Sequence, residues 1–383
     1  MNGHLLQQLL GVVLSVFILC DVFLTVLYAR IGTGIISDRV ARWTWGFFCF
    51  LSRFAGKHRG AVLSFCGPTS LVVLIFIWTL GLTCGTALVI HASLGTSVLI
   101  DTGRTPHDFA TALYLSGTSI STAGASNFYP ATPGMRLFFF ANSITGISIL
   151  TLSLTYLLQL YSALRERNTL GLKLHVLSRE TGDAAEILAG VGPEGEFHTG
   201  YTILVEMAAE LTALKEAHHF YPVLFYFRFR QPFYSVSHNA RLVLDLVTLI
   251  WTAIDQPRYR WLTKSAAVWQ LYDSAMLIMQ ILEEAFVPGG KPDPQDQFDY
   301  AKLKPAWDEH FHASLHRLRG AGIETVGDAT AGAQRYFEIR SKWQPYVDKL
   351  SDSGSFDSYE TDPSTAPPSV QDRLAEQNAH LGL

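Results

Sequence analysis

Charged side chains are scarce in the first part of this 383-residue chain. Only 12 of its 62 Asp, Glu, Lys and Arg residues precede Leu164, and the other 50 come after it. A domain surrounded by water carries charge over its whole surface, so this scarcity excludes an ordinary soluble domain at the N-terminal end. We therefore predict a membrane part followed by a part in water, both of them helical.

The chain also lacks the motifs that mark common catalytic and metal sites. G-x-S-x-G, H-E-x-x-H and G-K-[ST] do not occur, so nothing points to a hydrolase, a zinc protease or a nucleotide-binding loop. The four cysteines show no C-x-x-C spacing, which favours free thiols. We predict that the protein is not an enzyme and holds no cofactor and no metal.

Two further patterns lack the surroundings that a ligand site needs. Residues 190–195 have G-x-G-x-x-G spacing, but helical sequence precedes them and a proline interrupts them, so we expect a loop. His312 and His316 have metal-ligand spacing, with His310 nearby, but no third clear ligand accompanies them. We expect these histidines to lie on a solvated helix face.

Three apolar runs are long enough to cross a bilayer at about 1.5 Å per residue. They cover residues 5–28, 61–92 and 137–164, and the second helix is expected to begin near Pro68. Asp21 is the one charged residue in the first run. A carboxylate there is costly, so it is either paired or facing a wet cavity, or else hydrated near the inner interface.

The charges between the first two runs set the expected orientation. Residues 30–60 carry six Arg and Lys residues against the single Asp38, which places this segment on the cytoplasmic side of the cell membrane. The N-terminus is then outside and the C-terminus is cytoplasmic. Aromatic residues interleave with arginines at residues 42–54, as expected for a helix that lies in the membrane interface.

Residues 109–135 contain no charged side chain, yet glycines and prolines break the segment, so it cannot be one spanning helix. Its first dozen residues are predicted to form a helix, with Thr105 as the N-cap, Pro106 at the first helical position and Asp108 as the capping-box acid. A helix of this length is too short to cross a bilayer and indicates a re-entrant element.

The sequence A-L-Y-L-S-G-T-S-I-S-T-A-G-A-S-N-F-Y-P at residues 112–130 resembles the pore helix and filter of tetrameric potassium channels. The filters of that family commonly read T-x-G-Y-G-D. The resemblance extends over the flanking spans, residues 68–164, and gives as the selectivity filter Thr122, Ala123, Gly124, Ala125, Ser126 and Asn127. Ala125 stands where the family has an aromatic residue, and Ser126 where it has a second glycine.

The resemblance implies a mechanism in which rings of backbone carbonyls replace the hydration shell of a cation. One loop per chain implies a homotetramer in the lipid bilayer that passes K⁺ or Na⁺ and is gated by its cytoplasmic helices. Ala125 and Ser126 depart from the family pattern, so we expect weak or absent selectivity. The alternative is a non-conducting receptor or scaffold with a channel fold.

The third span carries hydroxyl and amide side chains at helical spacing. Ser148, Leu152, Thr155 and Gln159 share one face and are the candidate pore-lining residues. Gly146 lies near the place where channels of this class often have a hinge glycine. Alternatively, the hydroxyl groups bond to their own helix or to a neighbouring one.

After Asn168, helical stretches alternate with polar breaks and no strand pattern occurs. We expect helices at residues 170–188, 201–220, 238–254, 259–286, 300–318 and 329–350, with a loop at 287–297. The aromatic and arginine residues at 220–234 favour an inter-helix core or subunit contact over a nucleic-acid site.

We therefore predict an all-α membrane protein with four regions. Residues 1–60 hold the N-terminal transmembrane helix and the basic interfacial helix. Residues 61–168 form the pore domain, and residues 169–350 form a helical cytoplasmic domain with an unidentified cytoplasmic ligand as a candidate partner. Residues 351–383 are expected to be a disordered tail because they are acidic and rich in Pro, Ser and Thr.

Overall fold

The computed structural model describes residues 2–28, 30, 34–55, 58–125, 127–229, 231–287 and 300–353. Ser126, most of the predicted loop at 287–297 and the predicted tail from residue 354 onward lie outside the described residues. The chain divides into two compact units. The first unit comprises Met1–Phe47, Cys66–Ser162 and Phe220–Val223, and the second comprises Phe48–Phe65, Ala163–His219 and Leu224–Leu383.

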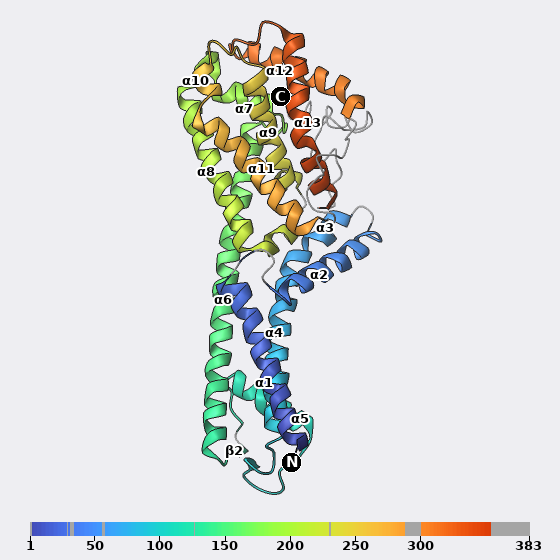
Figure 1. Ribbon diagram of the computed structural model, residues 1–383, viewed down its shortest axis with the longest axis vertical. Helices are drawn as coiled ribbons and strands as arrows, with labels where there is room; N and C mark the ends of the chain where they lie inside the picture. The colour runs from blue at the N-terminus through green and yellow to red at the C-terminus, as the bar shows by residue number, and fades with distance from the viewer. Residues whose placement is uncertain are drawn as a thin grey trace. The chain divides into compact units, whose positions relative to one another are not determined.

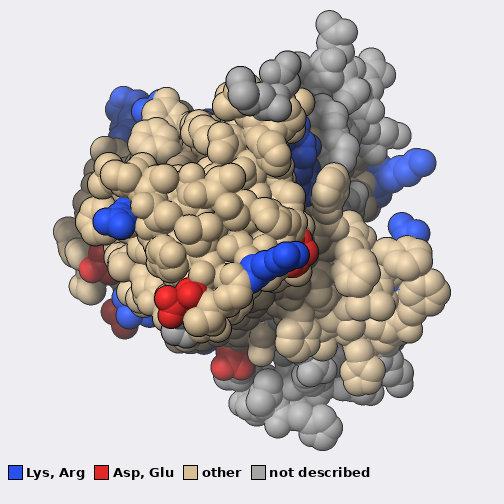
Figure 2. All heavy atoms as spheres, turned by 90° about the horizontal axis from the view of Figure 1, so that it is seen from below, with Lys and Arg blue, Asp and Glu red and all other residues tan. Residues whose placement is uncertain are grey.

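The described residues contain three helices that are long and apolar enough to cross a membrane, Gly3–Leu27, Arg59–His91 and Pro133–Leu177. They correspond to α1 (Asn2–Val22) with the π-helical η1 (Phe23–Leu27), to α3 (Arg59–Ser64) with α4 (Cys66–His91), and to α6 (Pro133–Leu177). The face drawn in Figure 2 carries few charged side chains. The prediction of an all-α membrane protein is confirmed.

Helices α1 and α4 lie side by side in the first unit (Figure 1), and small residues let their backbones approach closely. A Cβ atom on Gly11 would lie 2.5 Å from the carbonyl oxygen of Gly85, and one on Gly85 would lie 2.5 Å from the hydroxyl of Ser15. Close packing at small residues is a common way for helices to associate in membranes, where burial of apolar surface contributes little.

Asp21 is fully buried between these helices. One carboxylate oxygen accepts a hydrogen bond from the indole N–H of Trp78 at 2.8 Å, and the other accepts the backbone N–H groups of Ile35 and Ile36, each at 2.8 Å. Of the two sequence-based alternatives for Asp21, the pairing interpretation is confirmed and the hydrated one is wrong.

Helix α2 (Ser37–Ser52) follows the segment held by Asp21. Several of its large apolar side chains, and that of the nearby Phe54, are exposed: Trp43, Phe47, Phe50 and Phe54. A helix with exposed aromatic side chains next to arginines is typical of the membrane interface.

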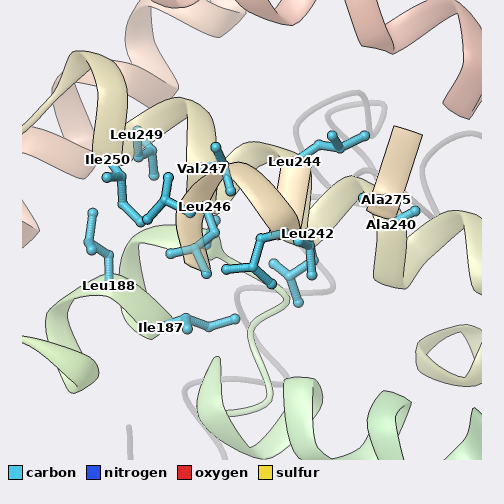
Figure 3. Packing of buried hydrophobic residues seen from close by; sticks show 14 of the residues in the cluster. Ile187, Leu188, Ala240, Leu242, Leu244, Leu246, Val247, Leu249, Ile250 and Ala275 are labelled. Carbon is cyan, nitrogen blue, oxygen red and sulfur yellow. The ribbon is translucent and has the colours of Figure 1, made fainter. Parts of the chain in front are cut away.

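The second unit is a bundle of helices. Besides α3 and the C-terminal part of α6, the bundle includes α7 (Ala184–Val191), α8 (His198–Phe220), α9 (Val236–Thr252), α10 (Arg260–Thr263), α11 (Ala266–Phe286), α12 (Lys304–Gly320) and α13 (Ala329–Ser353). Short 3₁₀ turns occupy Pro193–Gly195, Pro222–Tyr226, Pro232–Tyr234 and Tyr300–Lys302. Helix α9 is buried over nearly its whole length, and Figure 3 shows its side chains beside Ile187 and Leu188 of α7.

Two of the predicted helices are each interrupted in the structure. The predicted helix at 170–188 is divided, because α6 ends at Leu177 and α7 begins at Ala184, where the side chain of Asp183 accepts the N–H of Ala185. The predicted helix at 259–286 is divided before Ser265, whose side chain accepts the N–H of Val268. In both cases an N-cap side chain starts a new helix inside a run with continuous apolar periodicity.

The aromatic stretch at 220–234 contributes to packing within the second unit. Phe225 stacks on Phe286 with ring centres 4.5 Å apart, and the ring of Tyr226 lies 5.7 Å from that of Phe286. Such contacts support the prediction of an inter-helix core.

The second unit buries a polar cluster around Asp245. Its carboxylate accepts a hydrogen bond from the hydroxyl of Tyr336 at 2.5 Å and lies 3.3 Å from Nε2 of His310. The Arg340 guanidinium donates to the Tyr336 hydroxyl at 2.8 Å. The sequence analysis predicted that His310 lies on a solvated helix face. For His310 this prediction is wrong, because its side chain is part of the cluster around Asp245. In the part of the chain that the structure describes, no group of three or more His, Cys, Asp or Glu side chains could hold a metal ion.

Candidate functional site

The candidate site begins with α5 (Phe109–Ile120), a 12-residue helix between α4 and α6. Its length of about 18 Å is well below the thickness of a bilayer core. The prediction of Thr105 as N-cap is wrong. Asp108 is the N-cap, since its carboxylate accepts the N–H and the hydroxyl of Thr111, each at 2.8 Å, while the Thr105 hydroxyl accepts the N–H of Ile100.

The Asp108 side chain is exposed, and its hydrogen bonds from the Thr111 backbone and hydroxyl lower the pKa of its carboxyl below the usual value. The carboxylate is therefore negative at neutral pH and remains so in mild acid. A negative group at this position also stabilises the N-terminus of α5 through the helix dipole.

Serine side chains attach α5 to both neighbouring helices. The Ser116 hydroxyl donates to the carbonyl of Thr83 in α4 at 2.8 Å and is also hydrogen-bonded to the Thr86 hydroxyl. On the other side, the Ser143 hydroxyl of α6 lies 3.0 Å from the carbonyl of Ser119. These contacts fix the position of α5 within the first unit.

Gly146 of α6 lies directly against the C-terminal end of α5. A Cβ atom on Gly146 would lie 2.8 Å from the carbonyl carbon of Ile120, which is far inside van der Waals contact. No other residue fits here without displacing the backbone of α5. Helix α6 continues without a break through this position.

The loop after α5 folds back on the last turn of the helix. The N–H groups of Ser121, Thr122 and Gly124 donate to the carbonyls of Gly117, Ser119 and Thr118 at 2.9, 3.1 and 3.1 Å. Thr122 and Gly124 both have positive φ, +59° and +72°. For Thr122 this is unusual, because a β-branched side chain disfavours the left-handed region.

The backbone N–H groups and the backbone carbonyls of the loop differ in their partners. Here the N–H groups of Thr122 and Gly124 bind α5. No backbone N–H of the described residues donates to the carbonyls of Thr122, Ala123 or Gly124, so these oxygens remain available to a ligand.

A short hairpin frames the loop. Strands β1 (Val98–Ile100) and β2 (Phe128–Pro130) pair antiparallel, with Leu99 opposite Tyr129. The carbonyl of Asn127 accepts the N–H of Asp101 at 2.9 Å and extends the pairing by one bond. The loop is therefore held at its start by α5 and at its end by the hairpin.

A cavity of about 270 Å³ lies beside the loop, lined by α5, β2, α6 and the loop itself. Ala125 lines it together with Phe128, Phe139 and Ser143. Ala125 is half-buried and packs on a small apolar cluster that includes Val98 and Leu115. The small side chain of Ala125 therefore leaves part of this cavity unfilled.

The predicted site residues lie as follows. Thr122, Ala123, Gly124 and Asn127 are exposed, and Ser126 is outside the described residues. On α6, Ser148, Thr155 and Gln159 are exposed, whereas Leu152 is half-buried against a cluster that includes Ile18 and Trp78. The hydroxyl of Thr155 donates to the carbonyl of Thr151 at 2.9 Å, so this side chain bonds to its own helix.

Sequence reasoning missed the residues that position the loop. Ser116, Ser119 and Ser143 make the contacts between α5 and its neighbours. Their small polar side chains occur where membrane helices often pack, and this is the one signal that could have drawn attention to them.

The two spans and the re-entrant loop between them are similar to a known protein family. Residues 71–163 match a family model described as "Ion channel", and the match contains α5, the loop and most of α4 and α6. This segment is an ion-channel domain. The match points to a channel rather than an enzyme, and to an oligomeric protein in a lipid bilayer.

A second similarity, to a bacterial membrane protein, covers a longer part of the chain. The chain is 25% identical over 239 residues to "Uncharacterized membrane protein YdjJ" of Bacillus subtilis (strain 168). The alignment covers 62% of this chain and 66% of the relative, slightly less than two thirds of its length. No solved structure matches the chain.

Proposed function

We propose that the protein is a homotetrameric cation channel whose filter is formed by Thr122 to Asn127 and passes K⁺ and Na⁺ with weak selectivity. The observation that carries the proposal is the backbone of the loop. Its N–H groups bind the end of α5, and the carbonyls of Thr122, Ala123 and Gly124 accept none of the described N–H groups. Four such loops around an axis would place rings of carbonyl oxygens along it, as cation filters require.

Weak selectivity follows from the end of the filter that lies nearest the hairpin. The cavity beside Ala125 leaves open space behind the loop, so the carbonyl rings there can adjust to ions of different size. The chain has the sequence Ala125-Ser126 where the resembling family has an aromatic residue and glycine.

The proposed pore-lining face of α6 contains Ser148, Thr155 and Gln159. These side chains are exposed in the single chain, and the contacts of α6 with α5 lie at Ser143 and Gly146 instead. Ile144 and Thr151 are exposed on neighbouring positions of the same face, and we add them to the proposed pore lining.

The charge of residues 30–60 supports the proposed orientation of the chain in the membrane. Because this segment is basic, we place it on the cytoplasmic side and the N-terminus outside.

The deciding experiment measures reversal potential in bilayers that contain the purified protein, under opposed K⁺ and Na⁺ gradients. We expect a current with a reversal potential near zero. The double variant Ala125→Tyr, Ser126→Gly should shift the reversal potential toward the K⁺ equilibrium value, because the aromatic ring fills the cavity and the glycine restores the backbone freedom. Intact tetramers that carry no current in either form would contradict the proposal and favour a non-conducting receptor.

A further inference from the structure

The second unit contains a cavity of about 250 Å³ between α8 and the part of α6 that follows the apolar run. Most of its wall is apolar and comes from Ala163 and Leu170 of α6 and from Ala213, Leu214 and Ala217 of α8. This is the size of pocket that holds a small ligand or one part of a larger one.

Arg167 lines the cavity and is only 3% exposed. Its two terminal nitrogens donate to the backbone carbonyls of Leu224 and Phe227, at 2.9 and 2.7 Å. Its guanidinium carbon lies 5.6 Å from the ring centre of Phe229. The Nε atom is buried and makes no hydrogen bond, so a donor remains unused beside the cavity.

The described residues give Arg167 no carboxylate partner. Two acids line the cavity, but Glu210 pairs with Lys173 at 3.1 Å and Glu166 has an exposed side chain. A buried guanidinium that has only carbonyl partners keeps its full positive charge in a medium of low dielectric constant, which is costly. An anion in the cavity would offset that cost.

His218 of α8 is a second buried titratable side chain, and the charge of Arg167 acts on it. It is 1% exposed, its Nδ1 lies 3.0 Å from the carbonyl of Leu214, and its Nε2 has no hydrogen-bond partner. Burial and then the positive charge of Arg167 lower the pKa of His218 to about 4. The imidazole is therefore neutral at pH 7. Arg167 is the buried positive charge that an anion would meet, whereas Arg165, which also lines the cavity, is exposed.

We propose that this cavity binds an amphiphilic anion, with a carboxylate or phosphate head at Arg167 and an alkyl chain along the alanine and leucine wall. The ligand would come either from solution, as a free fatty acid, or from the bilayer, as an anionic lipid. Because the site joins α6 to α8, occupancy would also bias conduction. That last consequence rests on the proposed function, whereas binding itself does not.

The test measures binding to the purified full-length protein by calorimetry with decanoate, and by thermal unfolding in nanodiscs of phosphatidylglycerol against phosphatidylcholine. We expect saturable binding of decanoate, and none of decanol at the same concentrations, or a higher Tm in phosphatidylglycerol. Binding of decanoate would identify a free fatty acid as the source of the anion, and a higher Tm in phosphatidylglycerol would identify an anionic lipid. Arg167→Gln should weaken the binding by about tenfold or more, which corresponds to about 1.4 kcal/mol.

A second variant keeps the test decisive if Arg167→Gln does not fold. Ala213→Phe places a ring in the cavity from an exposed rim position and should abolish binding while Arg167 stays in place. Its matched control is Ala209→Phe, the same change one turn earlier on α8 at an exposed residue outside the cavity. Binding of neither anionic probe, equal binding of decanol, or equal effects of the two Phe variants would overturn the proposal.

Discussion

At the scale of single residues, buried polar side chains differ in how completely their hydrogen-bonding groups are used. Asp21 and Arg167 are both buried and charged, but they are satisfied differently. Asp21 accepts three N–H groups, so both of its side-chain oxygens have hydrogen-bond donors. Arg167 keeps an unused donor. This contrast separates a structural charge from a candidate ligand-binding one.

We predict that Asp21→Ala destabilises the protein strongly. The change leaves the Trp78 indole and two backbone N–H groups without an acceptor, at about 1–3 kcal/mol for each buried donor. The Tm in detergent should fall by at least about 4 °C. Asp101→Ala, at an exposed residue of the first unit, should leave the Tm nearly unchanged. Equal Tm values for the two variants would refute the structural role of Asp21.

The strained backbone at Thr122 gives a second expectation at this scale. A left-handed threonine costs on the order of 1–3 kcal/mol, so Thr122→Gly should raise the Tm of the protein if the loop keeps its present conformation. Circular dichroism melting in detergent can measure the difference. A lower Tm would mean that the threonine side chain contributes more through packing or hydrogen bonding than its backbone strain costs.

At the scale of elements, glycines set how closely helices approach. Gly146 is in contact with the backbone of α5, whereas Gly134, in the first turn of the same helix, has open space where a Cβ would lie. The two positions form a matched pair on α6.

We predict that Gly146→Ala displaces α5 and abolishes or greatly reduces the current, because the added methyl group overlaps the carbonyl of Ile120. Gly134→Ala should leave the current unchanged and slightly favour the helix, since Ala has the higher helix propensity. Single-channel recording in bilayers compares the two variants. Normal current in Gly146→Ala would show that α5 can move away without loss of function.

Helix positions followed from sequence better than helix ends did. Apolar run length predicted the three spans, because a bilayer fixes how many residues are needed. The N-cap of α5 was misplaced by three residues, since Thr105 and Asp108 are both good capping residues and only the fold directs the Thr105 hydroxyl to Ile100. The contact between Gly146 and Ile120 could not be predicted, because it depends on where α5 returns in space.

At the scale of the whole molecule, the second unit adds a pH-sensitive element. Burial by itself would lower the pKa of His310, but its hydrogen bond to Asp245 and the charge of Asp245 outweigh this and raise the pKa. Burial would likewise raise the pKa of Asp245, but His310, Arg340 and Arg241 hold it well below the usual range. The pair is therefore ionised over a wide range around neutral pH.

The sign of the pH dependence follows from these directions. The stabilisation from His310 is complete below its unfolded pKa of about 6.5 and is lost as pH rises through the higher folded value. We expect the Tm of the second unit to fall as pH rises above about 6.5. His310→Gln should flatten this dependence, and His312→Gln, at an exposed position on the same helix, should retain it. An unchanged profile in His310→Gln would assign the pH dependence to other groups.

The contact at Gly146 also limits how α6 can move. Helix α6 is one helix of 45 residues, about 68 Å long, and runs from the end of the loop region into the second unit. If α6 bends at Gly146, the point of bending is also the point at which α6 supports the carbonyl end of α5. Movement of the part of α6 that follows Gly146 would then displace the end of α5 and the start of the loop at the same moment, so the two movements would be coupled rather than independent.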